Sequence, residues 1–153
     1  MASREDIAAE RFTHGFNCAQ AVFSAYAPAL GLKEEDTLRI ATAFGAGMGR
    51  QQEVCGAVTG AYMVISAQCG MTDAANTGAK ERAYALVNEF ATKFRELHGS
   101  TICLDLLGCD MTTEEGRKEI ADKKLSTSIC LPCVQDACRI LDALVFTASP
   151  QNS

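Results

Sequence analysis

The feature that most constrains the fold is a run without charged residues from Val54 to Thr72, preceded by a glycine-rich loop. The loop and the start of the run read GAGMGRQQEVCGAVTG, from Gly45 to Gly60. A run of this length is typical either of a helix buried on all sides or of a membrane span. Glycine, threonine, serine and glutamine dilute its apolar character, which favours the buried helix. We therefore expect a helix over residues 54–69 at the centre of the molecule.

Cys55 falls in the first turn of this predicted helix, directly after the loop. Backbone N–H groups in a first turn lack partners within the helix and carry partial positive charge. A thiol there loses its proton more easily, and the thiolate is its reactive form. Gly56 and Gly60 share one helix face, so another backbone could approach the sulfur closely. Taken alone, the glycines favour the simpler role of tight helix packing.

The rest of the chain also has helical periodicity and no alternating strand pattern. Ser3, with Asp6 three residues later, predicts an N-terminal cap. Apolar residues at three- and four-residue spacing predict core-facing stripes over residues 16–30 and 79–97. We expect an all-α fold, a helical bundle of six to eight helices around the buried central one.

Length and composition favour a single domain over residues 1–153, with a frayed tail from about residue 149. The net charge is −5 and no basic cluster is present, which argues against nucleic-acid binding. The first residues carry charges where an export signal needs an apolar stretch, so we expect a cytoplasmic location. A homodimer is a reasonable expectation only because closed dimers are the commonest oligomers.

The composition departs from the ordinary in its cysteines. The eight are Cys18, Cys55, Cys69, Cys103, Cys109, Cys130, Cys133 and Cys138. In a small secreted protein they would indicate a disulfide framework, but in a chain with an adequate core and no visible export signal they favour thiol chemistry or metal binding. We assign no catalytic role to either histidine, His14 or His98.

Four cysteines fall at or near a predicted helix start: Cys18, Cys55, Cys103 and Cys130. Helix N-termini that converge on one pocket would stabilise thiolates, and equally a thiolate-bound metal. We expect Cys18, Cys55 and Cys103 to gather in one pocket with at least one of Cys130 and Cys133. Cys69, Cys109 and Cys138 are expected to pack as small apolar side chains, with Cys69 and Cys138 outside the pocket.

Cys130 and Cys133 form the strongest local motif, CLPC, with a proline in the predicted first helical turn. The motif has the form of a redox dithiol, although without a flanking βαβ pattern it is not a thioredoxin active site. We expect Cys130, nearer the helix start, to be the more reactive member of the pair. Cys133 would then be the resolving cysteine, which attacks the disulfide formed on Cys130. The alternative is a pair of buried, merely apolar cysteines.

Taken together, these residues resemble a family of small bacterial and archaeal proteins described as redox-active and named for a Cys, GCAxxG, Cys, Cys pattern. The resemblance is carried by GFNCAQAV at 15–22, FGAGMG at 44–49 and CGAVTGA at 55–61, then by Cys103 before LLG and a terminal cysteine before a Val-x-x-Ala helix. Here the order is Cys-Gly-Ala, where the family name has Gly-Cys-Ala. The resemblance implies a redox role but no particular reaction. It places the four family cysteines on Cys18, Cys55, Cys103 and Cys130, with Cys133 close enough to compete for the last.

Three function classes remain open. The first is thiol–disulfide redox chemistry that needs no cofactor and acts on an unknown redox partner, through Cys18, Cys55, Cys103, Cys130 and Cys133. The second is a zinc or iron–sulfur protein whose ligands would be Cys18, Cys55, Cys103 and Cys130. The third is a binding or structural protein with packed cysteines. We favour the first, because structural zinc sites usually use paired, short-spaced cysteines and only CLPC has that form.

Overall fold

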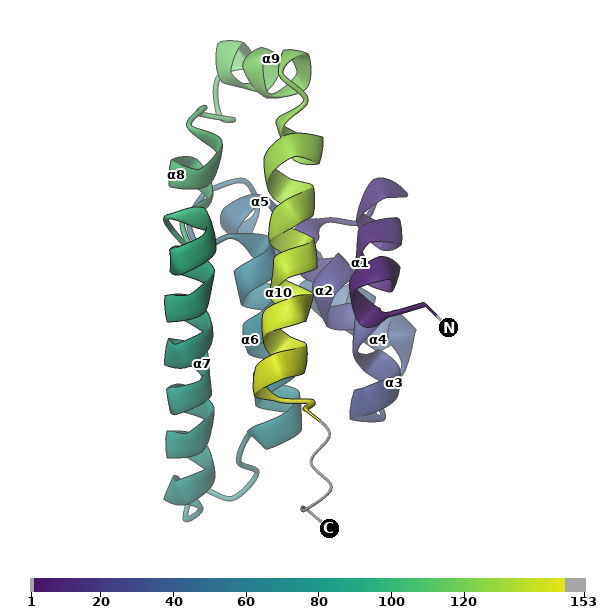
Figure 1. The fold of residues 1–153 in the computed structure, drawn as a ribbon, viewed down its shortest axis with the longest axis vertical. Helices are drawn as coiled ribbons and strands as arrows, with labels where there is room; N and C mark the ends of the chain where they lie inside the picture. Colours follow the sequence, from purple (N-terminus) through teal and green to yellow (C-terminus); the bar gives the residue numbers. More distant parts are fainter. Residues whose placement is uncertain (1, 148–153) are drawn as a thin grey trace.

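The computed structural model describes residues 2–147, and their regular secondary structure is helical (Figure 1). The longer helices are α1 (Arg4–Thr13), α2 (Cys18–Ala25), α4 (Glu34–Ala41), α6 (Gly56–Cys69), α7 (Thr77–His98), α9 (Glu114–Asp122) and α10 (Leu131–Leu144). The short segments are α3 (Ala27–Leu30), η1 (Thr42–Phe44), α5 (Gly45–Met48), α8 (Cys103–Leu107) and η2 (Ser126–Cys130). The predicted all-α class is confirmed. The described residues form ten α-helices, more than the six to eight expected, because α3, α5 and α8 are short segments of four or five residues. The tail predicted to fray lies outside the described residues.

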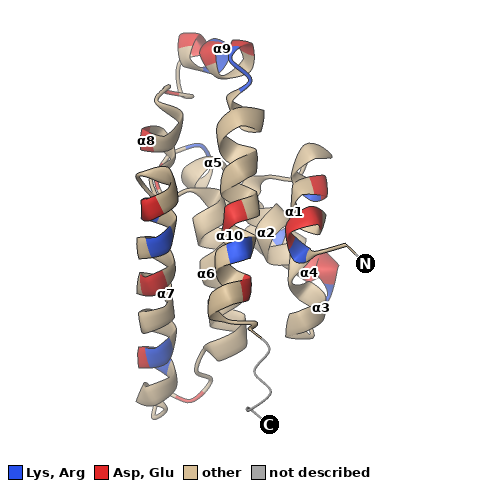
Figure 2. Ribbon diagram, viewed as in Figure 1, with Lys and Arg blue, Asp and Glu red and all other residues tan. Residues whose placement is uncertain are grey.

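Helix α6 forms the centre of the bundle, as the uncharged run predicts. It packs against α2, α7 and α10, which surround it in Figure 1, and it carries no charged residue (Figure 2). Val58, Val64 and Ile65 on α6 are fully buried. Burying one such side chain is worth roughly 1.5–3 kcal/mol, so these contacts are a main source of stability. Within residues 2–147, no helix combines the length and the apolar character that crossing a membrane requires.

Helix α2 approaches α6 closely at two glycines of α6. A Cβ atom added at Gly60 would lie 2.8 Å from the carbonyl oxygen of Ala19. One added at Gly56 would lie 3.0 Å from both the Ala19 nitrogen and the Cys18 Cβ. Close packing tolerates almost no extra volume at such contacts, so glycine is what lets the two backbones meet.

Helix α7 is amphipathic as predicted, except in its last turn. Ala83, Phe90 and Phe94 are buried, while charged residues recur along the rest of the helix (Figure 2). Leu97, predicted on the buried stripe, is 60% exposed. His98 turns inward in its place, and its ring lies 4.7 Å from that of Phe94.

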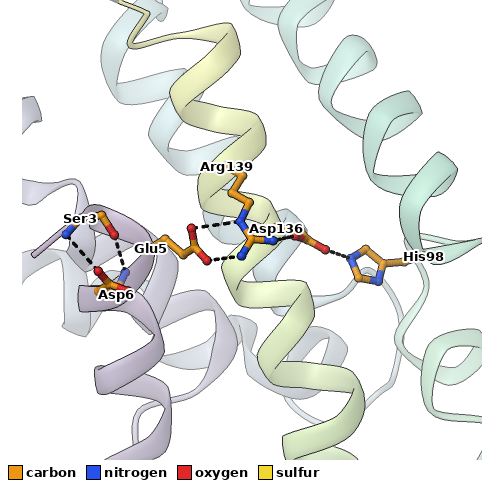
Figure 3. A network of polar contacts seen from close by, with 6 residues as sticks. All are labelled: Ser3, Glu5, Asp6, His98, Asp136 and Arg139. Carbon is orange, nitrogen blue, oxygen red and sulfur yellow. Dashed lines mark hydrogen bonds and ion pairs between the residues drawn. The ribbon is translucent and has the colours of Figure 1, made fainter.

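A chain of polar contacts links α1, α10 and α7 (Figure 3). Arg139 of α10 forms ion pairs with Glu5 of α1 and with Asp136 one turn earlier in α10. Asp136 also contacts His98 Nε2 of α7 at 2.9 Å. The Arg139 side chain is 60% exposed, so its pairs contribute little. The His98–Asp136 contact is more sheltered, with side chains 15% and 18% exposed.

The N-terminus of α1 is capped as the sequence predicts. The Asp6 backbone N–H donates to Ser3 Oγ at 3.0 Å, and the Ser3 N–H donates to the Asp6 carboxylate at 3.4 Å (Figure 3). Losing such a cap typically costs about 1 kcal/mol. The cap therefore fixes the start of α1 at Arg4. The next residue, Glu5, forms the ion pair with Arg139 of α10.

Replacement of Gly60 by alanine should destabilise the protein, although alanine is the better helix former. The added methyl group would meet the Ala19 carbonyl at 2.8 Å, and overpacking of this kind typically costs about 1–3 kcal/mol. The gain in helix propensity is only about 1 kcal/mol. We expect urea titration to show a net loss of up to about 2 kcal/mol in the free energy of unfolding.

Gly78→Ala is the matched control, because a Cβ at this position on α7 would make an ordinary contact of 3.8 Å with Asn76 Oδ1. Its free energy of unfolding should hold or rise. A Gly60→Ala variant as stable as Gly78→Ala would contradict the packing argument.

Candidate functional site

A cavity of about 180 Å³ lies where the ends of several helices meet. Its lining includes the five cysteines to which the sequence analysis assigned chemistry: Cys18, Cys55, Cys103, Cys130 and Cys133. The remaining lining residues are mostly apolar, and none carries a charge. The structure thus brings these five cysteines together, and it leaves the other three out of the cavity lining.

The packing of α2 against α6 places Cys18 and Cys55 next to each other. Cys18 is the first residue of α2, directly after Asn17, whose side chain caps the helix. Cys55 is the N-cap residue of α6, so it precedes the helix where the sequence predicted it in the first turn. Because Gly56 has no side chain, the Cys18 Cβ can lie against it.

Cys103 reaches the cavity through a short antiparallel pairing of two loops. The Cys55 N–H donates to the Thr101 carbonyl at 2.8 Å. The Cys103 N–H in turn donates to the Glu53 carbonyl at 2.6 Å. The pairing is a single isolated bridge, and one bridge leaves no alternating pattern from which the sequence could predict it.

Cys130 and Cys133 come from one continuous helical segment. The sequence predicts a helix start at Cys130, but helical backbone already begins at Ser126 and passes through η2 into α10. In η2 the Leu131 N–H bonds to the Ser126 carbonyl five residues earlier, the wider π-type turn. Pro132 lacks a backbone donor, and such irregular turns are where helices accommodate that loss. Cys130 therefore does not lie at a free helix N-terminus.

The glycine loop is a tight left-handed turn rather than a pliant one. Residues 46–50 all have positive φ, from 56° to 74°, and the left-handed conformation costs roughly 1–2 kcal/mol at each non-glycine position. The Glu53 N–H holds the turn by donating to the Gly47 carbonyl at 2.9 Å. Ala46 and Gly47 line the cavity, so the strained backbone lies at the site itself.

Gln52 is a site residue that no pattern in the sequence indicates. Its side chain is buried, with the residue only 5% exposed. Nε2 donates to the Cys109 carbonyl at 2.8 Å, and Oε1 accepts from the Met111 N–H at 2.8 Å. The side chain also hydrogen-bonds Cys103. A glutamine between polar neighbours gives no signal of burial in the sequence.

The pKa of Cys55 is lowered from its ordinary value, chiefly because Cys133 donates a hydrogen bond to it. The backbone N–H groups of Ala57 and Val58 lower it further, while burial acts against them. The same bond between the cysteines, together with burial, raises the pKa of Cys133. This pair therefore loses its first proton from Cys55 and keeps the second on Cys133.

Cys18 and Cys130 form a second hydrogen-bonded pair. The pKa of Cys130 is lowered by the bond from Cys18, and that bond and burial raise the pKa of Cys18. The pKa of Cys103 rises to about 12, mainly through burial. The raised pKa values of Cys18 and Cys103 run against the expectation that helix N-termini would stabilise thiolates: the bond to Cys130 and burial raise the first, and burial raises the second.

The other three cysteines have different surroundings. Cys138 is fully buried in α10, where its carbonyl accepts a hydrogen bond from the Tyr26 hydroxyl at 2.9 Å. Cys109 is also buried, and Cys69 at the end of α6 is half-buried. All eight cysteines are free thiols in this structure.

The described residues were also tested against the metal alternative. Among residues 2–147, no group of three or more His, Cys, Asp or Glu side chains is arranged to hold a metal ion. The hydrogen bonds instead join four cavity cysteines in two pairs.

A comparison with protein-family models matches residues 16–144 to the family described as "Putative redox-active protein (C_GCAxxG_C_C)". The match covers most of the chain and includes all five cavity cysteines. The chain therefore belongs to this family, which confirms the resemblance and supports a redox role. Searches of curated proteins and of solved structures give no match.

Replacement of Gln52 by leucine should lower the free energy of unfolding by roughly 1–3 kcal/mol, because a buried carbonyl and a buried N–H lose their partner. Urea titration measures the loss. Gln51→Leu is the matched control, since that exposed side chain bonds only the Met48 carbonyl three residues earlier. Its effect should stay within about 0.5 kcal/mol, and equal losses in both variants would contradict the role of Gln52.

Replacement of Cys133 by alanine should raise the pKa of Cys55, because the thiolate loses a hydrogen-bond donor. A hydrogen bond to a charged group stabilises it by about 1.5–3 kcal/mol, so its loss should raise the pKa measurably. The pH dependence of Cys55 alkylation, followed by peptide mass mapping, measures this value. Cys133→Ser retains a donor and should raise the pKa less. Identical pKa values in both variants would show that Cys133 does not stabilise the thiolate.

Proposed function

We propose that this member of the C_GCAxxG_C_C family is a thiol–disulfide redox protein in which Cys55 is the attacking thiolate and Cys133 its partner. The observation that carries the proposal is the gathering of five thiols around one cavity, with Cys55 directly before α6. The lowered pKa of Cys55, chiefly due to a hydrogen bond from Cys133, supports it. Such donors stabilise a thiolate without a metal or a cationic side chain. The adjoining cavity leaves room for a small molecule beside the sulfur.

The proposed reaction reduces a disulfide in two exchange steps. The Cys55 thiolate attacks one substrate sulfur, the substrate S–S bond breaks, and the other sulfur leaves as a thiolate. Cys133 transfers its proton to that leaving thiolate, and its own sulfur then attacks Cys55. This step forms the Cys55–Cys133 disulfide and releases the second substrate sulfur as a thiolate. Two electrons pass from the protein dithiol to the substrate.

Cys18 and Cys130 supply a second dithiol in the same cavity. The charge of Cys55 also raises the pKa of Cys18, which supports an interaction between the two pairs. Thiol–disulfide exchange between the pairs would return Cys55 and Cys133 to the reduced state. In a reducing cytoplasm, the expected location, both pairs would rest as dithiols.

A redox titration with mass mapping of every cysteine should reveal a Cys55–Cys133 disulfide that forms and reverses with the redox buffer. Cys55→Ala and Cys133→Ala should each abolish it. Cys69→Ala is the control, because this cysteine does not line the cavity and should leave the titration unchanged. A Cys130–Cys133 disulfide in its place would keep the redox function but overturn the proposed pairing.

Metal analysis of protein purified without oxygen separates this function from the zinc or iron–sulfur alternative. We expect the metal-free protein to remain folded by circular dichroism and to undergo the disulfide titration. Stoichiometric zinc or iron whose removal unfolds the chain, with no disulfide at any potential, would overturn the redox proposal in favour of metal binding.

A further inference from the structure

The thiol cavity shares a wall with a second hollow of about 210 Å³. Three residues line both spaces: Ala46, Met111 and Ile120. The remaining two residues of the second hollow are Arg50 and Arg117. The two spaces therefore adjoin, one apolar with five thiols and the other with two cationic side chains.

The charges of this region differ from those of the chain as a whole. The protein carries a net charge of −5, yet no aspartate or glutamate lines either space. Among the ion pairs of residues 2–147, none involves Arg50 or Arg117. Two arginines without an acidic partner beside an apolar cavity are complementary to an anion joined to an apolar group.

The backbone holds both arginines at this place. Arg50 ends the left-handed turn, with φ of 74°. Arg117 is fixed from α9, where its Nη1 donates to the Met111 carbonyl at 3.0 Å. In Figure 1, α5 and α9 lie at the same end of the molecule. The arginine hollow is thus built by the turn that also lines the thiol cavity.

We propose that the substrate of the thiol site is a small organic disulfide with an apolar body and one carboxylate. The disulfide enters the cavity beside Cys55, and the carboxylate lies between Arg50 and Arg117. This inference rests on the proposed function. The cavity is smaller than the roughly 300–1,000 Å³ typical of pockets for drug-sized ligands, so a five-membered cyclic disulfide on a short aliphatic chain suits it.

Reduction of such a cyclic disulfide by Cys55 and Cys133 opens the ring and leaves both sulfurs on one product molecule. The Cys55 thiolate attacks one ring sulfur and the ring S–S bond breaks, so the second ring sulfur becomes a thiolate on the same molecule. That thiolate takes the proton of Cys133, whose sulfur then attacks Cys55. The protein dithiol is oxidised to a disulfide, and the substrate is released as a dithiol after its last thiolate takes a proton from water.

The same features argue against larger polar disulfides such as glutathione disulfide. That molecule carries several charges close to its sulfurs, and the thiol cavity offers none to pair with them. Burying unpaired charges is costly, so such a substrate should react slowly. Selectivity for an apolar body with a single distant carboxylate is therefore the property to measure.

The test is a single-turnover oxidation of the reduced full-length protein by oxidised lipoate, by its neutral amide, and by glutathione disulfide. We expect lipoate to form the protein disulfide roughly 3- to 30-fold faster than lipoamide, since two partly exposed ion pairs give a preference of this order. Added salt should reduce the preference. In the Arg50→Gln, Arg117→Gln double variant the ratio of the two rates should fall toward one.

Arg82→Gln is the control, because this exposed arginine of α7 lines neither space, and it should retain the preference. Equal rates with lipoate and lipoamide, or a glutathione disulfide rate that matches lipoate, would overturn the inference. If the redox titration forms the Cys55–Cys133 disulfide but lipoate does not, only the substrate assignment fails. If neither forms it, the proposed function fails as well.

Discussion

The contact between α2 and α6 is the interaction on which the rest of the structure depends. At Gly60 the backbones lie too close to admit a side chain, and at Gly56 the gap is filled by the Cys18 Cβ. Cys18 begins α2 and Cys55 immediately precedes α6, so the contact that buries the apolar faces of both helices also fixes two thiols at one end of the pair. Helix α10 packs against both helices and adds Cys133, with Cys130 at the end of η2 directly before it. Core and site are one packing arrangement, and a change that separated these helices would alter stability and thiol chemistry together.

Position at a helix end is not what distinguishes the reactive thiols in this cavity. Cys18 and Cys103 both begin helices, yet their pKa values are raised: that of Cys18 chiefly by its hydrogen bond to Cys130 and then by burial, and that of Cys103 chiefly by burial. Cys55 and Cys130 have lowered pKa values because each accepts a hydrogen bond from another cysteine. In this apolar cavity, whose lining has no cationic side chain, the protonated thiol of each pair thus stabilises the thiolate of its partner by a hydrogen bond.

The helices and the cysteines that line the cavity could be predicted from the sequence. The backbone turn and the hydrogen bonds that hold the cavity together could not. Helical periodicity and the uncharged run identified α6 and α7, and the position of the cysteines near helix ends brought the right five together. The left-handed turn was missed because alanine, methionine and arginine at positive φ contradict local preference and are held there by tertiary contacts. Gln52 was missed because burial of a glutamine depends on which backbone groups it meets, here those of Cys109 and Met111.

The polar chain across α10 also bears on the chemistry of the cavity. Asp136 follows Cys133 by three residues, one helical turn, and its charge adds to the Cys55 bond and to burial in raising the pKa of Cys133. His98 and Arg139 hold the Asp136 carboxylate from two sides. A contact that joins α10 to α7 thereby also helps to keep the proton on Cys133. In the proposed reaction that proton serves twice, first in the hydrogen bond that stabilises the Cys55 thiolate and then as the proton delivered to the leaving sulfur. In that reaction the carboxylate one turn away would favour the protonated form of Cys133, beside the larger contributions of the Cys55 bond and of burial.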